Sequence, residues 1–225
     1  MLDYKLKSSK KISCIIVTFL PNIKELKKLL SQHKKNFSNI ILVNNSPEIS
    51  LKSFISSQIK IINNAKNIGL ASALNVGILE AKKHGAEMIA LFDQDTKLSS
   101  NFSQQMLQYI NEYQTDKPVA VYSPIYHNNV IDETAKHINF KPFRLIRGAI
   151  DESDYAHPHY VITSGSFIPM EVLDDIGLMC EELFIDFVDI EWCLRARRHG
   201  YEVVAINKVM IYHHLGDYPV HIMNH

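Results

Sequence analysis

The sequence has no excess of either charge, since 24 Lys and Arg balance 24 Asp and Glu among 225 residues. Proteins that bind nucleic acid normally carry a basic surplus, so its absence argues against a nucleic-acid partner. The sequence also contains no internal repeat, linker or low-complexity tract. Hydrophobic residues make up 46% and charged residues 21%, values that are typical of a packed globular core and exclude wholesale disorder, collagen and coiled coil.

Cysteine is scarce, with only Cys14, Cys180 and Cys193. These are too few and too scattered for a disulfide framework or a CxxC zinc site. No apolar run approaches the roughly 18 to 20 residues that a membrane span needs, and the stretch 12–20 is stopped by Pro21, which argues against a signal peptide. We therefore expect a cytoplasmic, reduced protein.

Charge is distributed unevenly along the chain. Lysines outnumber acids between residues 5 and 35, whereas 151–191 is rich in acids. A solvated lysine face is one interpretation, and attraction to an anionic membrane surface or a lipid-phosphate substrate is the other. Peripheral association with the inner face of the cell membrane therefore stays open.

The first half of the chain alternates between strand and helix patterns. Short apolar runs typical of buried strands lie at 12–18, 40–43, 59–62 and 88–92. Helical patterns cover Asn22 to His33, Gly69 to Lys83 and 101–113. This alternation predicts an α/β fold, with a mostly parallel, Rossmann-like sheet and helices on both faces.

The second half is predicted to be mixed. Expected elements are a strand at 119–122, a loop-like segment at 126–160 with a hairpin near 140–150, a short helix from Pro169 to Gly177, a helix at 189–199, and a pair of short strands at 201–209. One domain over residues 1–225 is the simplest organisation.

Polar residues follow each predicted strand of the first half, at Thr18, Asn44–Asn45, Asn63–Asn64 and Asp93–Asp95. In parallel sheets, ligands bind beyond the carboxyl ends of the strands, at a switch in strand order. The sequence lacks the GxGxxG and GxxxxGK[ST] motifs of dinucleotide and P-loop folds. These strand ends therefore predict a site of a different kind.

Asp93 and Asp95 lie on the same side of an extended backbone, because side chains alternate along a strand. Two close carboxylates suit a hard divalent cation such as Mg²⁺, completed by phosphate oxygens and water. A loop start with Asx-turn chemistry is the other interpretation. A dehalogenase-type phosphatase is disfavoured, because Lys97 stands where that motif needs Thr or Val.

The segment 184–195 groups Asp186, Asp189 and Glu191 with aromatic residues. Partial desolvation by aromatic neighbours raises the proton affinity of a carboxylate towards that of a useful base. Alternatively, Asp189 is a helix N-cap and Glu191 forms an ion pair with Arg195, four residues later.

His213 and His214 precede a Gly turn near the C-terminus. A neutral imidazole from this pair could ligate a metal, with Asp217 orienting it. A structural role is the alternative for either histidine.

In their order and spacing, these motifs resemble the family-two glycosyltransferases of the GT-A fold, and more closely their rhamnosyltransferase-like branch. The resemblance covers most of the chain. It rests on the segments Val17–Phe19, Val43–Ser46, Asn67–Ala71 with Asn75 and Gly77, Phe92–Asp95, Ser164–Gly165, Asp186–Trp192 with Arg195, and His213 with Gly216–Asp217. One departure is Val188 before Asp189, where many relatives have Glu.

The resemblance implies a role for each site residue. The donor nucleotide-sugar would be bound by Thr18, Asn45, Asn67, Ala71, Asp93 and Asp95. The metal, Mg²⁺ or Mn²⁺, would be held by Asp95 and His213, although His214 competes for the latter role. Asp189 would be the catalytic base, and the acceptor would contact Gly165, Glu191 and Trp192.

The resemblance also implies the reaction. An inverting transfer would move a sugar from a nucleotide-sugar to a hydroxyl of a glycan or lipid-linked acceptor in surface polysaccharide synthesis. The donor would be dTDP-rhamnose or a UDP-sugar, bound by about residues 1–122, with the acceptor bound by about 123–225. The alternatives are a catalytically silent nucleotide-sugar-binding scaffold and another metal-dependent enzyme acting on nucleotide-sugars.

Overall fold

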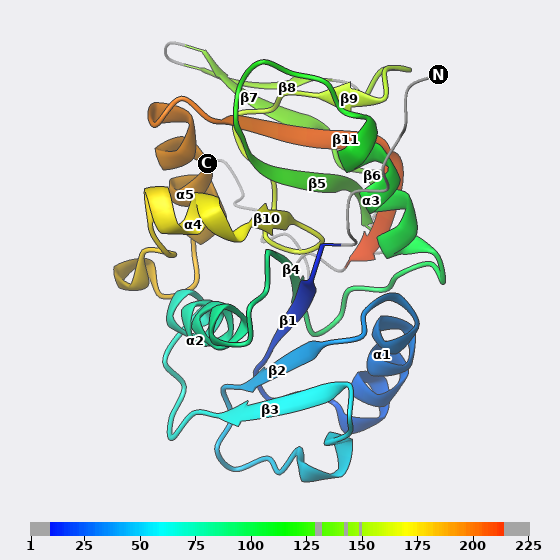
Figure 1. Ribbon diagram of the computed structural model, residues 1–225, viewed down its shortest axis with the longest axis vertical. Coiled ribbons are helices and arrows are strands. Elements are labelled where there is room, and N and C mark those ends of the chain that lie inside the picture. Colours follow the sequence, from blue (N-terminus) through cyan, green and yellow to red (C-terminus); the bar gives the residue numbers. More distant parts are fainter. Residues whose placement is uncertain (1–9, 129–131, 142–143, 149, 214–225) are drawn as a thin grey trace, which may run out of the picture.

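A large mixed sheet forms the centre of the protein in the computed structural model (Figure 1), which describes residues 10–128, 132–141, 144–148 and 150–213. Within these residues the sheet has nine strands: eight in the order β3-β2-β1-β4-β10-β5-β11-β9, and β6, which pairs with the last two residues of β5. Strand β10 runs antiparallel to both of its neighbours, β4 and β5. The predicted α/β fold, with a mostly parallel sheet and a mixed second half, is confirmed.

The four predicted strands of the first half are present. They are β1 (Ile12–Thr18), β2 (Ile40–Asn44), β3 (Ile59–Asn63) and β4 (Met88–Asp93), all parallel. Their register aligns Thr18 with Asn44 and Asn44 with Asn63, and pairs Val17 with Asp93. The polar strand ends therefore meet at one edge of the sheet.

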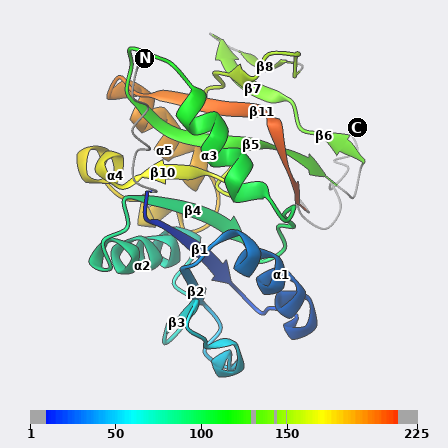
Figure 2. The same cartoon turned by 45° about the vertical axis from the view of Figure 1, so that its right-hand side comes forward.

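Helices cover both faces of the sheet, as predicted (Figures 1 and 2). One face carries α2 (Leu70–Lys83), α4 (Met170–Ile176) and α5 (Val188–Arg198), and the other carries α1 (Ile23–Asn36) and α3 (Phe102–Glu112). Single 3₁₀ turns lie at η1 (Lys52–Phe54) and η2 (Glu181–Leu183). Each face therefore has its own apolar core against the central strands.

Helix α1 shows why the sequence pattern was sufficient in this half. The Asn22 side chain accepts hydrogen bonds from the N–H groups of Lys24 and Glu25, which caps the helix. Leu26, Leu29, Leu30 and His33 are buried at helical spacing.

The described residues contain no helix with the length and hydrophobicity of a membrane span.

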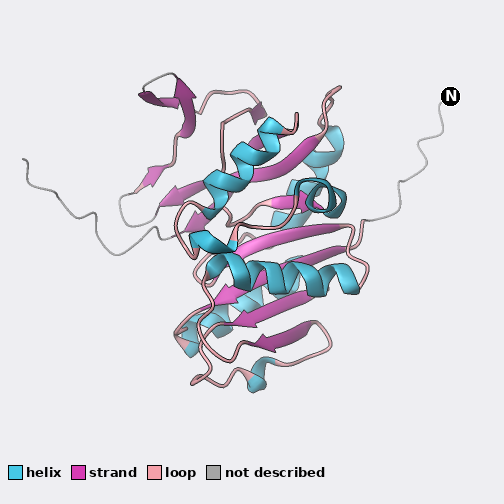
Figure 3. Cartoon of the chain, turned by 90° about the vertical axis from the view of Figure 1, so that its left-hand side faces the viewer, coloured by secondary structure: helices cyan, strands magenta, loops and turns pink. Residues whose placement is uncertain are grey.

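The second half contains more strand than predicted. Its strands are β5 (Val119–Asn128), β6 (Glu133–Thr134), β7 (His137–Lys141), β8 (Arg144–Gly148), β9 (Tyr155–Ala156), β10 (Phe167–Pro169) and β11 (Glu202–His213). The loop-like prediction for 126–160 was wrong, and the hairpin lies earlier than predicted, with β7 and β8 forming a separate two-stranded sheet (Figure 3).

The predicted pair of short strands near the C-terminus is also wrong, because β11 is one long strand. Its register against β5 shifts between Ile206 and Met210. This bulge contains the polar residues in the middle of β11. There the Asn207 side chain donates to the Ser153 carbonyl at 3.0 Å and contacts His137 Nε2 at 2.8 Å. Partners from a distant strand and a distant loop thus stabilise a polar side chain within β11.

Candidate active site

The polar strand ends open into a cleft of about 540 Å³. The cleft lies where the strand order reverses, because β1 has β2 on one side and β4 on the other. Its lining residues are Val17, Phe19, Asn45, Asn67, Gly69, Leu70, Asp93, Gln94, Asp95, Phe184 and Ile185. Four of the predicted donor residues, Asn45, Asn67, Asp93 and Asp95, are thus brought together on one cleft.

Asn45 organises the floor of this cleft. Its amide nitrogen donates to Asn67 Oδ1 at 3.0 Å and to the Gly69 carbonyl at 3.1 Å. Its amide oxygen accepts from Asn64 Nδ2 at 2.9 Å and from the Ile68 N–H at 3.3 Å. Asn45 is buried and ties the end of β2 to the segment that begins α2.

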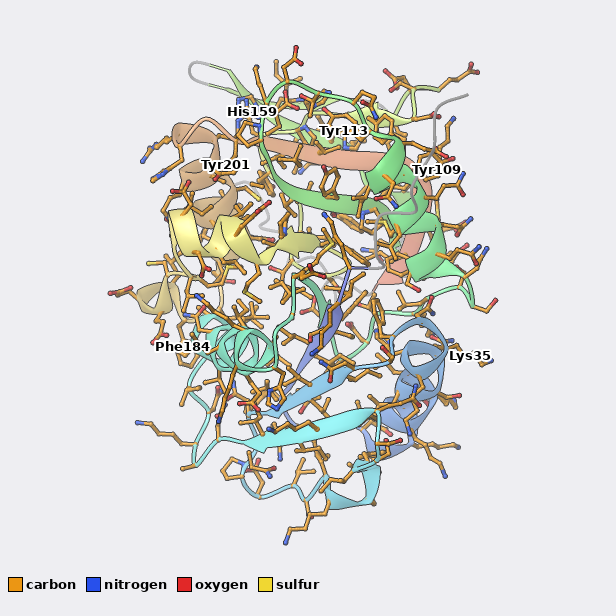
Figure 4. All side chains as sticks on the ribbon, in the orientation of Figure 1. Lys35, Tyr109, Tyr113, His159, Phe184 and Tyr201 are labelled. Atoms are coloured by element: carbon orange, nitrogen blue, oxygen red, sulfur yellow. The ribbon has the colours of Figure 1, made fainter. Side chains whose placement is uncertain are left out.

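The start of α2 closes against Phe184, which the sequence analysis placed among the aromatic residues near Asp189 but not at this cleft. The Phe184 carbonyl accepts hydrogen bonds from the N–H groups of Leu70 at 2.6 Å and Ala71 at 3.2 Å. Gly69 permits this approach, because its φ is +84° and a Cβ there would lie 2.6 Å from the Phe184 ring. Figure 4 shows Phe184 beside α2.

Gln94 is a second residue that the sequence analysis missed. Its amide nitrogen donates to the Phe19 carbonyl at 2.9 Å, and its amide oxygen accepts from the Phe19 N–H at 2.9 Å. These two hydrogen bonds fix the loop after β1 to the segment that carries Asp93 and Asp95. In the sequence, the position of Gln94 between two aspartates was the signal that could have identified it.

A buried serine holds the backbone of the carboxylate pair. The N–H of Asp93 donates to Ser164 Oγ at 3.1 Å, and the hydroxyls of Ser164 and Thr96 are hydrogen-bonded to each other. The neighbouring Gly165 is buried, has a φ of +85° and donates its N–H to the Leu91 carbonyl at 2.7 Å. Gly165 was predicted to contact the acceptor, and the structure places it beneath the surface as a support for this loop.

Asp189 is the second residue of α5 and not its N-cap, a position held by Phe187. Its carboxylate accepts the N–H of Ile190 at 2.8 Å, and the N–H of Thr163 also favours its charged form. Burial outweighs these backbone hydrogen bonds, including one from the N–H of Asp189 itself, and raises the pKa of Asp189 above its usual value. The predicted desolvation of this carboxylate is confirmed in direction.

The aromatic surroundings of Asp189 differ from the expectation. Phe184 and Phe187 are 48% and 65% exposed, and Asp186 is exposed as well. Both phenylalanines have positive φ, at 57° and 63°, which is unusual for residues with a side chain. The third aromatic residue of the expectation, Trp192, does lie near Asp189, because both line one small cavity together with Thr163.

Two predicted donor residues lie below the cleft and not on its surface. Thr18 is fully buried, and its hydroxyl donates to the Val43 carbonyl at 3.4 Å. Ala71 is fully buried in the first turn of α2. Neither side chain lines the cleft, whereas Val17 and Phe19, which flank Thr18, do.

Two predicted acceptor residues are engaged within the fold. Trp192 is 2% exposed and donates from Nε1 to the Gly177 carbonyl at 3.1 Å. The Glu191 carboxylate forms a two-pronged pair with Arg195, at 2.8 and 2.9 Å. Arg195 also donates to the backbone carbonyls of the last residue of α4 and of Leu178. The alternative interpretation of Glu191 as an ion-pair partner of Arg195 is confirmed.

The predicted metal ligand His213 ends β11, where its backbone pairs with Asn128. Its side chain, and all of His214, Gly216 and Asp217, lie outside the described residues. Among the residues that the structure describes, no three His, Cys, Asp or Glu side chains are close enough to hold a metal by themselves. Asp95 nevertheless lines the cleft beside Asp93.

Comparison with known proteins identifies the family. The sequence model of Glycosyl transferase family 2 matches residues 13–177. The dTDP-rhamnosyl transferase RfbF of Shigella flexneri is 31% identical over 220 residues, which cover 94% of this chain and 71% of that protein.

Solved structures show the same fold at low sequence identity. A crystal structure of GalNAc-T7 with UDP, GalNAc and Mn²⁺ matches 93% of this chain with a TM-score of 0.74 at 14% identity. A structure of S. aureus TarS 1-349 in complex with UDP-GlcNAc matches 93% with a TM-score of 0.66 at 16% identity. The chain spans 44% and 60% of those two proteins. By its sequence and its GT-A fold, this chain belongs to glycosyl transferase family 2, in the rhamnosyltransferase-like branch.

Proposed function

We propose that this protein transfers a sugar from a nucleotide-sugar to a hydroxyl of a glycan or lipid-linked acceptor, with inversion at the anomeric carbon. Rhamnose from a dTDP donor is favoured, because the Shigella relative is a dTDP-rhamnosyl transferase. A UDP-sugar is the alternative, since TarS binds UDP-GlcNAc. The donor would occupy the half of the chain up to about residue 122, and the acceptor the half from about residue 123.

One observation carries this proposal: the 163–164 segment contacts both the candidate donor-binding residue Asp93 and the candidate base Asp189. Ser164 accepts the N–H of Asp93 at the end of β4. The N–H of Thr163 faces the carboxylate of Asp189 at the start of α5. The backbone at Asp93 and the carboxylate of the candidate base are thus both held by one two-residue segment, which supports a common site for the donor and the acceptor.

The residues in the cleft suit a divalent metal. Mg²⁺ is typically held by one or two carboxylates together with substrate phosphates and water, so the absence of a three-residue cluster in the described part of the chain agrees with such a site. Asp95 would hold Mg²⁺ or Mn²⁺, with His213 as a second ligand. When bound, the cation would stabilise the negative charge that develops on the departing diphosphate.

The protein's own groups then supply orientation and proton transfer. The cleft over Asn45 and Asn67 would hold the nucleotide, and Asp93 would contact its ribose. Asp189 would accept the proton of the attacking hydroxyl, and its raised pKa makes it a stronger base than an exposed aspartate. Such a base typically contributes about 10²- to 10⁴-fold in rate.

A peripheral membrane location would suit a lipid-linked acceptor. Helix α1 carries the exposed lysines Lys24, Lys27, Lys28 and Lys35. Lysines near an anionic bilayer contribute about 1 kcal/mol each. Co-sedimentation with phosphatidylglycerol vesicles, but not with phosphatidylcholine vesicles, would support this part of the proposal.

The decisive experiment is a donor screen. The protein is incubated with dTDP-rhamnose, UDP-glucose and UDP-GlcNAc, with and without Mn²⁺, and nucleoside diphosphate release is measured with and without a rhamnose-terminated acceptor. We expect metal-dependent release that rises with the acceptor present. Binding of donors without release under any condition would favour the silent scaffold instead.

A further inference from the structure

Two parts of the cleft come from neighbouring strands whose backbone pairing ends before the cleft begins. The ladder between β1 and β4, which lie side by side in Figure 2, has Val17 and Asp93 as its last pair. Beyond that pair, Phe19 after β1 and Asp95 after β4 both line the cleft. A connection other than the ladder is therefore needed to fix these two parts relative to each other.

The side chain of Gln94 provides this connection. Its Nε2 donates to the Phe19 carbonyl and its Oε1 accepts from the Phe19 N–H, both at 2.9 Å. A carboxamide carries the same donor and acceptor as a peptide group, so it satisfies both backbone groups of Phe19 at once. Gln94 thus extends the pairing of β1 with β4 into the cleft.

The loop that carries Phe19 depends on such hydrogen bonds, because its own backbone conformation is unfavourable. Leu20 has a φ of +45°, a conformation that costs free energy and persists only where the surroundings fix it. The Leu20 N–H donates to Ser46 Oγ, just after β2, at 2.6 Å. Phe19 is 46% exposed, so packing alone does not fix its ring. Gln94 and Ser46 therefore hold this loop from two sides.

The carboxylate pair has a separate anchor. The Asp93 N–H donates to Ser164 Oγ at 3.1 Å, and the Ser164 hydroxyl is hydrogen-bonded to Thr96. Ser164 and Thr96 are both fully buried. Because these contacts do not involve the Gln94 side chain, its replacement should release Phe19 and leave the carboxylate pair in place.

We propose that Gln94 is a positioning residue for the nucleoside part of the donor and that it acts by holding Phe19 at a fixed place relative to Asp93 and Asp95. This inference rests on the proposed function, in which the cleft holds a nucleotide-sugar. The Phe19 ring offers an aromatic face on which a nucleobase stacks, and the carboxylate pair receives the metal and the diphosphate. Fixed spacing lets one donor molecule make both contacts without first ordering the loop, which increases its affinity.

Two probes separate these contacts. The first is dTDP or UDP, whichever the wild type binds more tightly, and the second is inorganic diphosphate, which has no nucleoside. Calorimetry on the full chain with Mn²⁺ gives both dissociation constants. Gln94→Met keeps the length of the side chain but makes neither hydrogen bond. We expect it to bind the nucleotide about tenfold more weakly, the effect of losing two neutral hydrogen bonds, and to bind inorganic diphosphate as the wild type does.

The matched control is Gln104→Met, on the exposed surface of α3, which should keep both wild-type affinities. Wild-type nucleotide affinity in Gln94→Met would overturn this inference alone. An equal loss for both probes would also overturn it, because a merely structural role would lower the two affinities together. If the wild type itself bound neither nucleotide, the proposed function would fail and this inference with it.

A second variant reaches the same loop from its other side. Ser46→Ala removes the acceptor of the Leu20 N–H, so it should likewise weaken nucleotide binding and spare inorganic diphosphate; wild-type nucleotide affinity would contradict the role given to this loop. Amide hydrogen exchange of the ligand-free protein, followed by NMR, tests the contact directly. In Gln94→Met the Phe19 amide should exchange about tenfold faster, while the Asp93 amide exchanges as in the wild type. Unchanged exchange at Phe19 would overturn the proposal.

Discussion

Asp93 and Asp189 are far apart in the sequence but are held by adjacent residues of the loop before β10. The Asp93 N–H donates to Ser164 Oγ at 3.1 Å, and the Thr163 N–H faces the Asp189 carboxylate. Gly165, at a φ of +85°, lets this loop pack against Pro124. The relative position of the carboxylate pair and the candidate base thus depends on a three-residue segment. Substitutions of Asp189 and of Asp95 test the groups on its two sides.

Asp189→Asn should abolish most turnover while leaving donor binding nearly intact. The substitution keeps the shape of the side chain but removes the proton acceptor, so we expect kcat to fall by about 10²- to 10⁴-fold. Transfer kinetics give kcat, and calorimetric titration with the nucleoside diphosphate gives donor affinity. Asp186→Asn, on an exposed neighbouring residue, is the matched control, and wild-type kcat in Asp189→Asn would refute the base assignment.

The pH profile of kcat should report the raised pKa of Asp189. A base acts only when deprotonated, so activity should rise with pH through this pKa. Because burial raises it, the midpoint of the acid limb should lie above the usual value for aspartate. The measurement is kcat between pH 4 and 9 with saturating donor, and a midpoint at or below the usual aspartate value would contradict the assigned role.

Asp95→Asn should weaken the metal-dependent part of donor binding. Replacing a carboxylate by an amide removes the negative charge that a divalent cation prefers. We expect dTDP or UDP to bind the variant with similar affinity in the presence and absence of Mn²⁺, whereas the wild type should show a clear difference in calorimetry. Asp116→Asn, at an exposed site before β5, should behave as the wild type. A full Mn²⁺ effect in Asp95→Asn would remove Asp95 from the metal site.

Gly69→Ala should destabilise the protein more than Gly200→Ala. Both glycines have a left-handed φ, +84° and +88°, so both substitutions incur a backbone penalty of about 1–2 kcal/mol. Only at Gly69 would the new Cβ also meet a neighbour, Phe184, at 2.6 Å, whereas nothing lies within 4 Å at Gly200. Denaturant unfolding measures both free energies, and equal losses would show that the Phe184 contact adjusts without cost.

The buried His33 should make the free energy of unfolding depend on pH. Burial lowers its pKa to about 4, and its Nε2 has no hydrogen-bond partner among the described residues. Between about pH 6.5 and 4 the unfolded chain binds a proton there that the folded chain does not, so stability should fall as the pH falls, by up to about 3 kcal/mol.

His33→Leu isolates this effect. The variant has no titrating group at the site, so its free energy of unfolding should lose that part of the slope between pH 4 and 6.5. His199→Gln, on an exposed histidine, should keep the wild-type slope. Identical slopes for His33→Leu and the wild type would exclude His33 as the source.

The sequence by itself determined the parallel half of the fold and the edge of the sheet that carries the site. Local patterns were sufficient there, because each buried apolar run ends in polar residues and the helices show helical spacing of apolar residues, with α1 also capped by Asn22. Parallel strands place those ends side by side whatever fills the rest of the chain. Asn45, Asn67, Asp93 and Asp95 were therefore found together as predicted.

Only the tertiary structure decided which side chains reach the cleft and which support it. Thr18 and Trp192 match the family motifs, yet both are buried. Phe184 and Gln94 shape the cleft through hydrogen bonds to residues distant in the sequence. The periodicity of apolar residues in a strand or helix determines which face of that element is buried. Which buried faces contact one another depends on the order of strands in the sheet and on the packing of the loops.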